Sequence, residues 1–92
     1  MYQVRLLDTA QEELSKLHKP ISQRVIKRIR WLGNNLDSIN PESLKGSLTG
    51  FYKLRVGDYR VLYEILLEEK TIVIHAIGHR KDIYQKKDRK KV

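Results

Sequence analysis

Three cationic side chains, Lys53, Arg55 and Arg60, lie on a short segment whose spacing brings them together. The segment 51–63 alternates apolar and polar residues on both sides of Gly57-Asp58, which predicts a β-hairpin with a two-residue turn. In the register that this turn sets, Arg55 faces Arg60 across the hairpin. Like charges directly opposite one another destabilise a sheet. We therefore expect this face to hold an anion.

The chemistry of these side chains points to a phosphate site, since the three cations share their face of the hairpin with no carboxylate. Arginine binds phosphoryl oxygens with paired hydrogen bonds, and its electrostatic effect is greatest where charge develops in a phosphoryl transition state. Lys53 has a second possible role, because two neighbouring arginines disfavour its charged form and a neutral lysine can accept a proton. From these residues alone, a binding surface is favoured over a catalytic site.

A second group of reactive side chains follows the last predicted strand. His79 could transfer protons near neutral pH, Arg80 could join the phosphate site, and Tyr84 could stack on a base. Neighbouring residues of a strand point to opposite faces of the sheet. If the strand continues, only one of His79 and Arg80 enters the site, and the sequence does not decide which.

The overall composition limits the possible functions. The net charge of +8, from 19 Lys and Arg against 11 Asp and Glu, favours nucleic acid, an anionic surface or an acidic protein as partner. Cysteine is absent, which excludes disulfides and thiolate chemistry. The apolar runs are too short for a membrane span, and no apolar leader follows Met1, so we expect a cytoplasmic protein. The histidines lack metal-ligand spacing, and we expect neither a metal nor a cofactor.

The elements that position these residues are predicted to form one α+β domain over residues 1–92. The expected order is β-α-α-β-β-β, a helical hairpin packed on a small, mostly antiparallel sheet, with a short C-terminal helix or tail from Lys81. A further helical turn is expected at 40–42. Helices gathered on one face of the sheet leave the other face free. The cations would project from that free face. The expected strands are 2–6, 52–56, 59–66 and 71–77, and the expected helices are 10–17 and 20 to about 33.

The second predicted helix carries a further polar group away from its apolar stripe. Arg24, Lys27 and Trp31 cluster on one side of that helix. A solvated helical face is the favoured interpretation. The alternative is a partner-binding surface anchored by Trp31.

Three motifs together resemble the RelE branch of the RelE/ParE toxin superfamily: Leu44-Lys45-Gly46, the hairpin 52–63, and the ending 77–84. The resemblance implies a RelE-like fold and the toxin of a type II toxin–antitoxin pair. It further implies a ribosome-dependent endoribonuclease, an mRNA interferase that cuts mRNA in the A site without a metal. The reaction expected of the family is attack of a ribose 2′-OH on the adjacent phosphodiester, which leaves a 2′,3′-cyclic phosphate.

The resemblance also implies roles for individual residues. Lys53 and Arg55 match the basic pair that assists deprotonation and stabilises the transition state. Arg60 matches the arginine that neutralises phosphate charge. Arg80 matches the arginine that protonates the leaving 5′-oxygen, and Tyr84 matches the tyrosine that stacks on the cut nucleotide.

Two departures from the family pattern affect the proton transfers. Arg55 stands where lysine is also found in the family, so Lys53 becomes the only lysine that can act as the base. His79, beside Arg80, is a more ordinary general acid than an arginine, and other members of the superfamily use histidine. The proton donor therefore stays open between Arg80 and His79.

The resemblance implies a RelB-like antitoxin with an acidic segment as partner, together with the ribosome and mRNA, and no membrane or small-molecule cofactor. Two alternatives remain on the same fold. One is a ParE-like inhibitor of DNA gyrase, which lacks nuclease chemistry. The other is a non-catalytic module that binds RNA or an antitoxin, since every residue named above can also simply bind phosphate.

Overall fold

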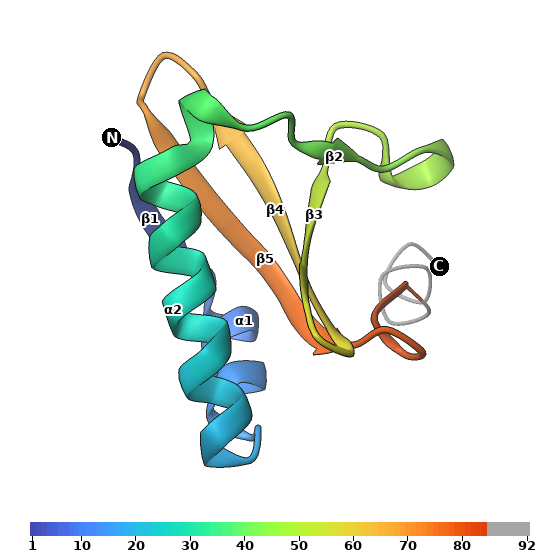
Figure 1. Ribbon diagram of the computed structural model, residues 1–92. Coiled ribbons are helices and arrows are strands. Elements are labelled where there is room, and N and C mark those ends of the chain that lie inside the picture. The colour runs from blue at the N-terminus through green and yellow to red at the C-terminus, as the bar shows by residue number, and fades with distance from the viewer. Residues whose placement is uncertain (85–92) are drawn as a thin grey trace.

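The computed structural model describes residues 1–84 and shows two helices beside one sheet (Figure 1). The sheet has five strands in the order β1-β5-β4-β3-β2. β1 runs parallel to β5, and the other neighbours are antiparallel. This confirms the predicted α+β class and the mostly antiparallel sheet. The expected C-terminal helix or tail falls largely on residues 85–92, outside the described residues. The elements are β1 (Gln3–Leu6), α1 (Asp8–Ser15), α2 (Lys19–Asn35), β2 (Glu42–Ser43), β3 (Tyr52–Val56), β4 (Tyr59–Leu66) and β5 (Thr71–His79).

The β3–β4 hairpin has the predicted register. Arg55 pairs with Arg60 and Val56 pairs with Tyr59, so Gly57 and Asp58 form the turn. Gly57 adopts φ 58°, a left-handed conformation that a glycine adopts without a steric penalty. The local sequence therefore sets both the turn and the face to which each cation points.

The region of Glu42 is a strand, and the predicted helical turn there is wrong. Glu42 pairs with Lys53 and Ser43 pairs with Tyr52, which makes β2 the edge of the sheet. The amide of Leu44 also donates to the carbonyl of Phe51 at 2.9 Å. The outer edge of β3 would otherwise present unpaired backbone groups, and this pairing outweighs the weak local preference for a turn.

A bulge in β5 decides which face each of its last residues occupies. Tyr63 pairs with Ile74 and Leu62 with Ala76, so His75 is the extra residue in β5. Beyond the bulge, the alternation is shifted by one position. His79 therefore lies opposite Tyr59, on the same face of the sheet as the main core.

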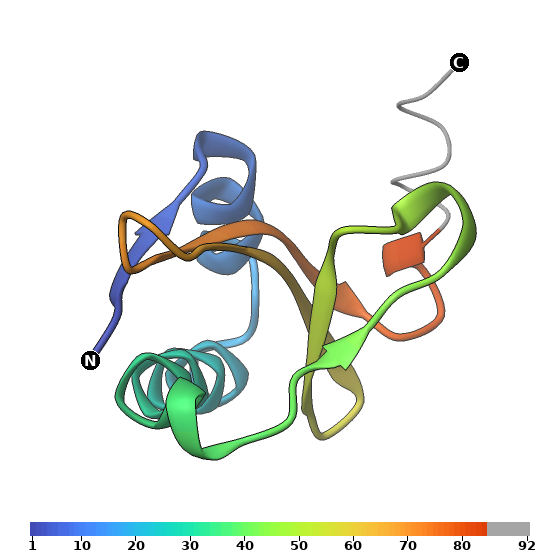
Figure 2. The ribbon, with the colours of Figure 1, turned by 90° about the horizontal axis from the view of Figure 1, so that it is seen from above.

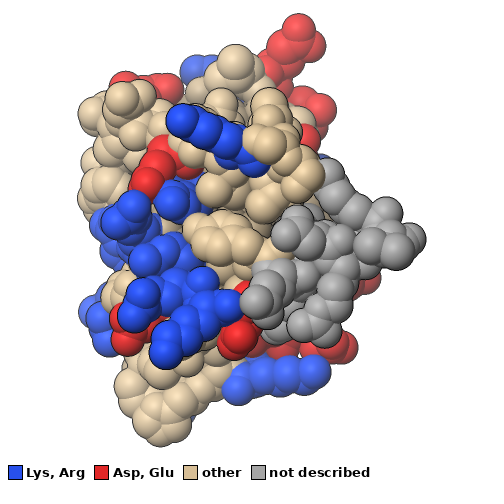
Figure 3. All heavy atoms as spheres, turned by 90° about the vertical axis from the view of Figure 1, so that its right-hand side faces the viewer, with Lys and Arg blue, Asp and Glu red and all other residues tan. Residues whose placement is uncertain are grey.

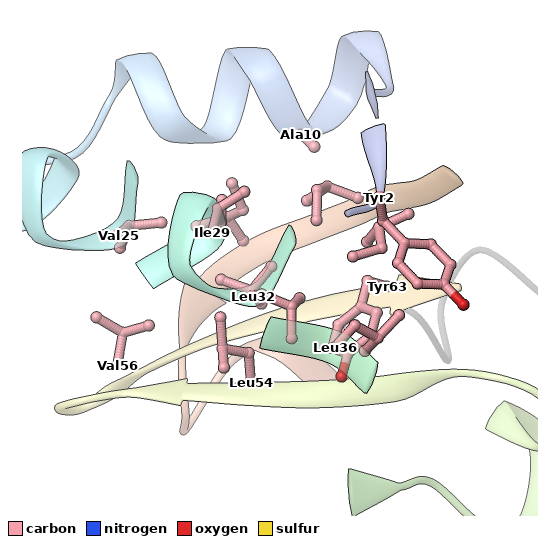
Figure 4. Close-up of a cluster of buried hydrophobic side chains, with 13 residues drawn as sticks. Tyr2, Ala10, Val25, Ile29, Leu32, Leu36, Leu54, Val56 and Tyr63 are labelled. Carbon is pink, nitrogen blue, oxygen red and sulfur yellow. The ribbon is translucent and has the colours of Figure 1, made fainter. Parts of the chain in front are cut away.

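The main core lies between α2 and one face of the sheet (Figure 4). Val25, Ile29 and Leu32 form the buried stripe of α2 and recur at helical spacing. α1 continues from β1 along β5, where the amide of Ile77 donates to Oε1 of Glu13 at 2.9 Å. Figure 2 shows α2 on one side of the strongly twisted sheet. Within the described residues, neither helix is long and apolar enough to cross a bilayer.

The opposite face of the sheet is only partly free, which corrects the sequence-based expectation. Leu62, Ala76 and Ile83 form a second buried cluster there, and Leu44 and Tyr84 pack against it. The chain after β5 folds back over the sheet to supply two of these residues. This second cluster is small, but it fixes the position of Tyr84 beside the cationic face.

Burial of Tyr63 predicts a loss of stability in alkaline solution. Its side chain is 1% exposed, and burial raises the pKa of the Tyr63 phenol to about 12. Because the phenol ionises near pH 10 in the unfolded chain, its contribution is fully present below that pH and is lost as the pH rises toward 12. The free energy of unfolding should fall by up to about 2 kcal/mol over this range.

Urea titrations at several pH values between 8 and 11 would measure this effect, with Tyr63→Phe as the matched variant. The phenylalanine variant should lose stability less steeply than the parent protein as the pH rises. Parallel curves for the two proteins would contradict the assignment to Tyr63.

Candidate active site

Lys53 and Tyr84 come together on the cationic face although 31 positions separate them in the sequence. Nζ of Lys53 lies 6.0 Å from the centroid of the Tyr84 ring. Tyr84 follows Ile83, whose buried side chain anchors this segment on the sheet. The site thus combines a cation from β3 with an aromatic ring from the chain after β5.

A carboxylate that the sequence did not predict lies between two of the cations. Glu42 accepts hydrogen bonds from Arg55 through both oxygens, at 3.2 Å from Nε and 2.9 Å from Nη2. The Oε2 atom of Glu42 also lies 3.3 Å from Nζ of Lys53. The expectation of a face without a carboxylate is therefore wrong. A two-residue strand carries too little periodicity in the sequence to reveal this neighbour.

Glu42 is held in its charged form by these contacts. The hydrogen bond from Arg55 lowers the pKa of the Glu42 carboxyl, and Lys53 adds to that effect, against a smaller opposing effect of burial. Among residues 1–84, the charge closest to Lys53 is therefore the negative charge of Glu42. The predicted role of Lys53 as a neutral base assumed that its charged neighbours were the two arginines alone. Glu42 shows that this assumption is wrong.

Arg60 is oriented by the hairpin turn. Its Nη1 atom donates to the carbonyl of Gly57 at 2.9 Å and to the carbonyl of Tyr59 at 2.8 Å. The guanidinium group has five N–H donors. Its Nε and Nη2 atoms have no protein acceptor among residues 1–84, so they can bind an anion.

Arg80 is attached to the same turn. Its backbone amide donates to the carbonyl of Asp58 at 2.8 Å. Its Nε atom lies 3.5 Å from Oδ1 of Asp58. The turn therefore brings Arg60 and Arg80 together, although 20 positions separate them.

His79 lies away from this group. Its ring meets the ring of Tyr59 edge-on, with centroids 5.4 Å apart, on the face that carries the main core. Its Nδ1 atom accepts a hydrogen bond from the amide of Lys81 at 3.1 Å. Of the two residues between which the sequence left the proton donor open, Arg80 lies beside Arg60 at the hairpin turn, and His79 lies on the other face of the sheet.

The resulting arrangement is suited to a phosphodiester. Figure 3 shows Lys and Arg side chains gathered over one part of the surface that carries the site. Fixed cations stabilise a phosphoryl group most when its charge increases in the transition state, and an adjacent aromatic ring can stack on a base. The structure brings together five of the six predicted site residues, and it adds Glu42. The five are Lys53, Arg55, Arg60, Arg80 and Tyr84.

The family model described as the ParE toxin of the type II toxin–antitoxin system parDE matches residues 4–84. Toxin RelG of Mycobacterium tuberculosis is 34% identical over 85 residues, which cover 92% of this chain and 98% of that protein. A putative RelE-like toxin protein of Escherichia coli is 31% identical over 86 residues, or 90% of each chain. Among solved structures, a toxin–antitoxin complex, RelBE2 of M. tuberculosis, contains a chain that superposes with a TM-score of 0.77 at 34% identity, covering 86% of this chain and 98% of that one.

Proposed function

The chain belongs to the RelE/ParE superfamily of type II toxin–antitoxin toxins, and from this premise we propose that it is a ribosome-dependent endoribonuclease that cleaves mRNA. The observation that carries the proposal is the proximity of Lys53 and Tyr84 on the face that also carries the anchored arginines. A surface that only neutralised an acidic partner would not need an aromatic ring fixed beside a cation. A nuclease needs both groups, the cation to bind the phosphate and the aromatic ring to stack on the base.

In the proposed reaction, the 2′-oxygen of the nucleotide at the cut forms a bond to the adjacent phosphorus, and the bond from phosphorus to the 5′-oxygen breaks. The products are a 2′,3′-cyclic phosphate and a free 5′-hydroxyl. We assign Lys53, once the entering RNA has displaced Glu42 from it, to accept the proton of the 2′-OH, and Arg80 to donate a proton to the leaving 5′-oxygen. Exchange with solvent then restores the protonation state of both side chains. Arg55 and Arg60 stabilise the non-bridging oxygens.

The entering phosphate competes with Glu42 for the same donors. Glu42 already takes two hydrogen bonds from Arg55 and lies close to Lys53. RNA binding must therefore displace this carboxylate from at least one of the two cations. By competing for these donors, Glu42 lowers the affinity of the site for anions that make no further contacts with the protein.

Glu42→Gln should therefore bind RNA several-fold more tightly than the parent protein, because the neutral amide leaves Lys53 and Arg55 free of a competing charge. Binding of a 2′-O-methylated RNA trinucleotide at low salt, measured by fluorescence anisotropy, would test this. Glu12→Gln is the matched control, since Glu12 pairs with Lys16 on the surface of α1. Equal gains in the two variants would show that only the net charge matters.

The partner we propose is a RelB-like antitoxin, which is supported by the RelBE2 complex among the similar structures. A net charge of +8 favours an acidic segment as the binding element. The carboxylates of such a segment would bind the same cations that we propose bind the phosphate of the RNA. The association should weaken as the salt concentration rises.

The function is tested by induced expression in a bacterium, followed by mapping of mRNA 5′ ends. Cuts in phase with codons, confined to translated regions, are the expected result. The matched control is a Lys53→Gln/Arg60→Gln variant, which should leave mRNA intact.

Because the matching family model is named for ParE, inhibition of DNA gyrase is the alternative function. Intact mRNA together with accumulating DNA breaks would establish that alternative and refute the nuclease.

A further inference from the structure

Helix α2 carries a dense and unbalanced positive charge. Its sequence from Lys19 to Asn35, KPISQRVIKRIRWLGNN, contains five Lys and Arg and no Asp or Glu. Within residues 1–84, none of these five side chains forms an ion pair. By contrast, Lys53, Arg55 and Arg80 of the active site each have a carboxylate partner. Unpaired cations on one element repel each other, so this helix is suited to an anionic partner.

The charged side of α2 is continuous with the active site. A Cβ atom at Gly57 would lie only 3.1 Å from Nη2 of Arg24, so the Arg24 guanidinium lies against the hairpin turn. Between α2 and the hairpin is a shallow hollow of ≈ 290 Å³. Arg55 lines this hollow and also contacts Glu42 in the site. The other residues that line it are Arg24, Lys27, Arg28, Val56 and Gly57.

A second hollow of ≈ 590 Å³ adjoins the first and extends farther along the helix. The two hollows share Arg24 and Lys27. Beside the first hollow, Arg28 covers one side of the Trp31 ring at 4.3 Å from its centroid. Trp31 is 38% exposed, one of few large apolar side chains at the surface of the described residues. We call the surface formed by these two hollows and the neighbouring Trp31 the α2 groove.

We propose that the α2 groove binds the phosphate backbone of the same single RNA strand whose cleavage we propose at the active site. The inference rests on the proposed function and extends it to the nucleotides that flank the cut. Successive phosphates of a strand that passes Arg55 would meet Arg24, Lys27 and Arg28. These cations supply affinity without reading the base sequence.

The geometry favours a single strand over double-helical RNA. The hollow begins at Arg55, within the site, so the strand that enters the site is the one nearest to the groove. Trp31 and the guanidinium of Arg28 offer flat surfaces on which an unpaired base can stack. In an A-form duplex the bases are stacked inside and the major groove is deep and narrow, so neither surface would reach a base.

The test compares two triple variants with the same change in charge. Arg24→Gln/Lys27→Gln/Arg28→Gln alters the groove. Arg5→Gln/Lys16→Gln/Lys70→Gln alters cations on or next to β1, α1 and the start of β5 that do not line the groove. Each protein is titrated with a fully 2′-O-methylated RNA, which cannot be cleaved through a 2′-OH. The probes are a trinucleotide that fills only the active site, a strand of about 12 nucleotides, and an RNA hairpin of the same length.

Loss of roughly tenfold or more in affinity for the long strand, in the groove variant alone, is the expected result. Its slope of log K against log salt concentration should become shallower by about 2, since each phosphate contact on a single strand contributes about 0.7. Trinucleotide binding should be unchanged. Equal losses in both triple variants, a long strand bound no better than the trinucleotide, or preference for the RNA hairpin would each overturn the proposal.

This test is independent of the one for the proposed function. Mapping of mRNA 5′ ends establishes or refutes cleavage whatever the groove does. If cleavage is established and the groove variant binds the long strand normally, only the groove proposal fails. If cleavage is refuted while the long strand still depends on the groove, the proposed function fails and the groove remains an RNA-binding surface.

Discussion

Arg60→Ala should reduce the rate of mRNA cleavage by about 10²- to 10³-fold, the loss typical of removing one fixed donor from a charged transition state. The reason is the anchoring of this guanidinium, since two turn carbonyls orient Nη1 while Nε and Nη2 point to no protein acceptor within residues 1–84. A group oriented before the substrate arrives does not have to reorganise during the reaction. Single-turnover cleavage on programmed ribosomes would measure the rate.

Arg5→Ala on β1 is the matched control, because it removes the same side chain from an edge strand that β5 separates from β4, the strand of Arg60. Its cleavage rate should stay near that of the parent protein. Thermal unfolding should be nearly unchanged in both variants, since neither arginine is part of the buried core. Arg60→Lys adds a second comparison, because it keeps the charge and loses the planar donor arrangement. A rate for Arg60→Ala within a few-fold of the parent would contradict the phosphate site.

Ile83→Ala should abolish most of the cleavage activity while leaving the main fold intact. Ile83 is 0% exposed and holds the segment after β5 on Leu62 and Ala76. Removing three carbons from this small cluster leaves the segment without its anchor. Tyr84 and Arg80 would then leave their positions beside Lys53 and the turn. We expect a loss comparable to that of Tyr84→Ala, about tenfold or more, since stacking on one base contributes roughly 1–3 kcal/mol.

Ile29→Ala is the matched variant in the main core. There the same substitution should lower the free energy of global unfolding by about 2–5 kcal/mol. Its cleavage rate, measured well below its melting temperature, should be close to normal. Hydrogen exchange would show whether Ile83→Ala opens only the segment after β5. Our interpretation is that the cluster around Ile83 holds only the segment after β5 and is separate from the main core. It fails if Ile83→Ala retains full activity, or if this variant lowers the melting temperature as much as Ile29→Ala does.

Local patterns in the sequence predicted a large part of the site correctly. The Gly57-Asp58 dipeptide and the alternation around it set the register, and so placed Arg55 opposite Arg60. Turn geometry and side-chain alternation are properties of neighbouring residues. They do not depend on the rest of the fold, and for this reason they can be read before the fold is known.

Other features depend on residues that are distant in the sequence. Glu42 reaches Lys53 and Arg55 only because the edge of β3 recruits a two-residue strand. His79 faces the main core only because His75 bulges out of β5 and shifts the alternation. A single extra residue reverses the faces of all residues beyond it, and nothing in the local pattern marks it.

The sequence by itself determined the fold class, the hairpin and the set of cations, because these follow from periodicity, turn chemistry and composition. Only the tertiary structure decided which of these residues act together. It brought Tyr84 to Lys53, attached Arg80 to the hairpin turn, and inserted Glu42 among the cations. It also joined Arg24 on α2 to the same turn. The physical reason is that pairing of strand edges and burial of apolar side chains fix these contacts, and both involve partners far apart along the chain.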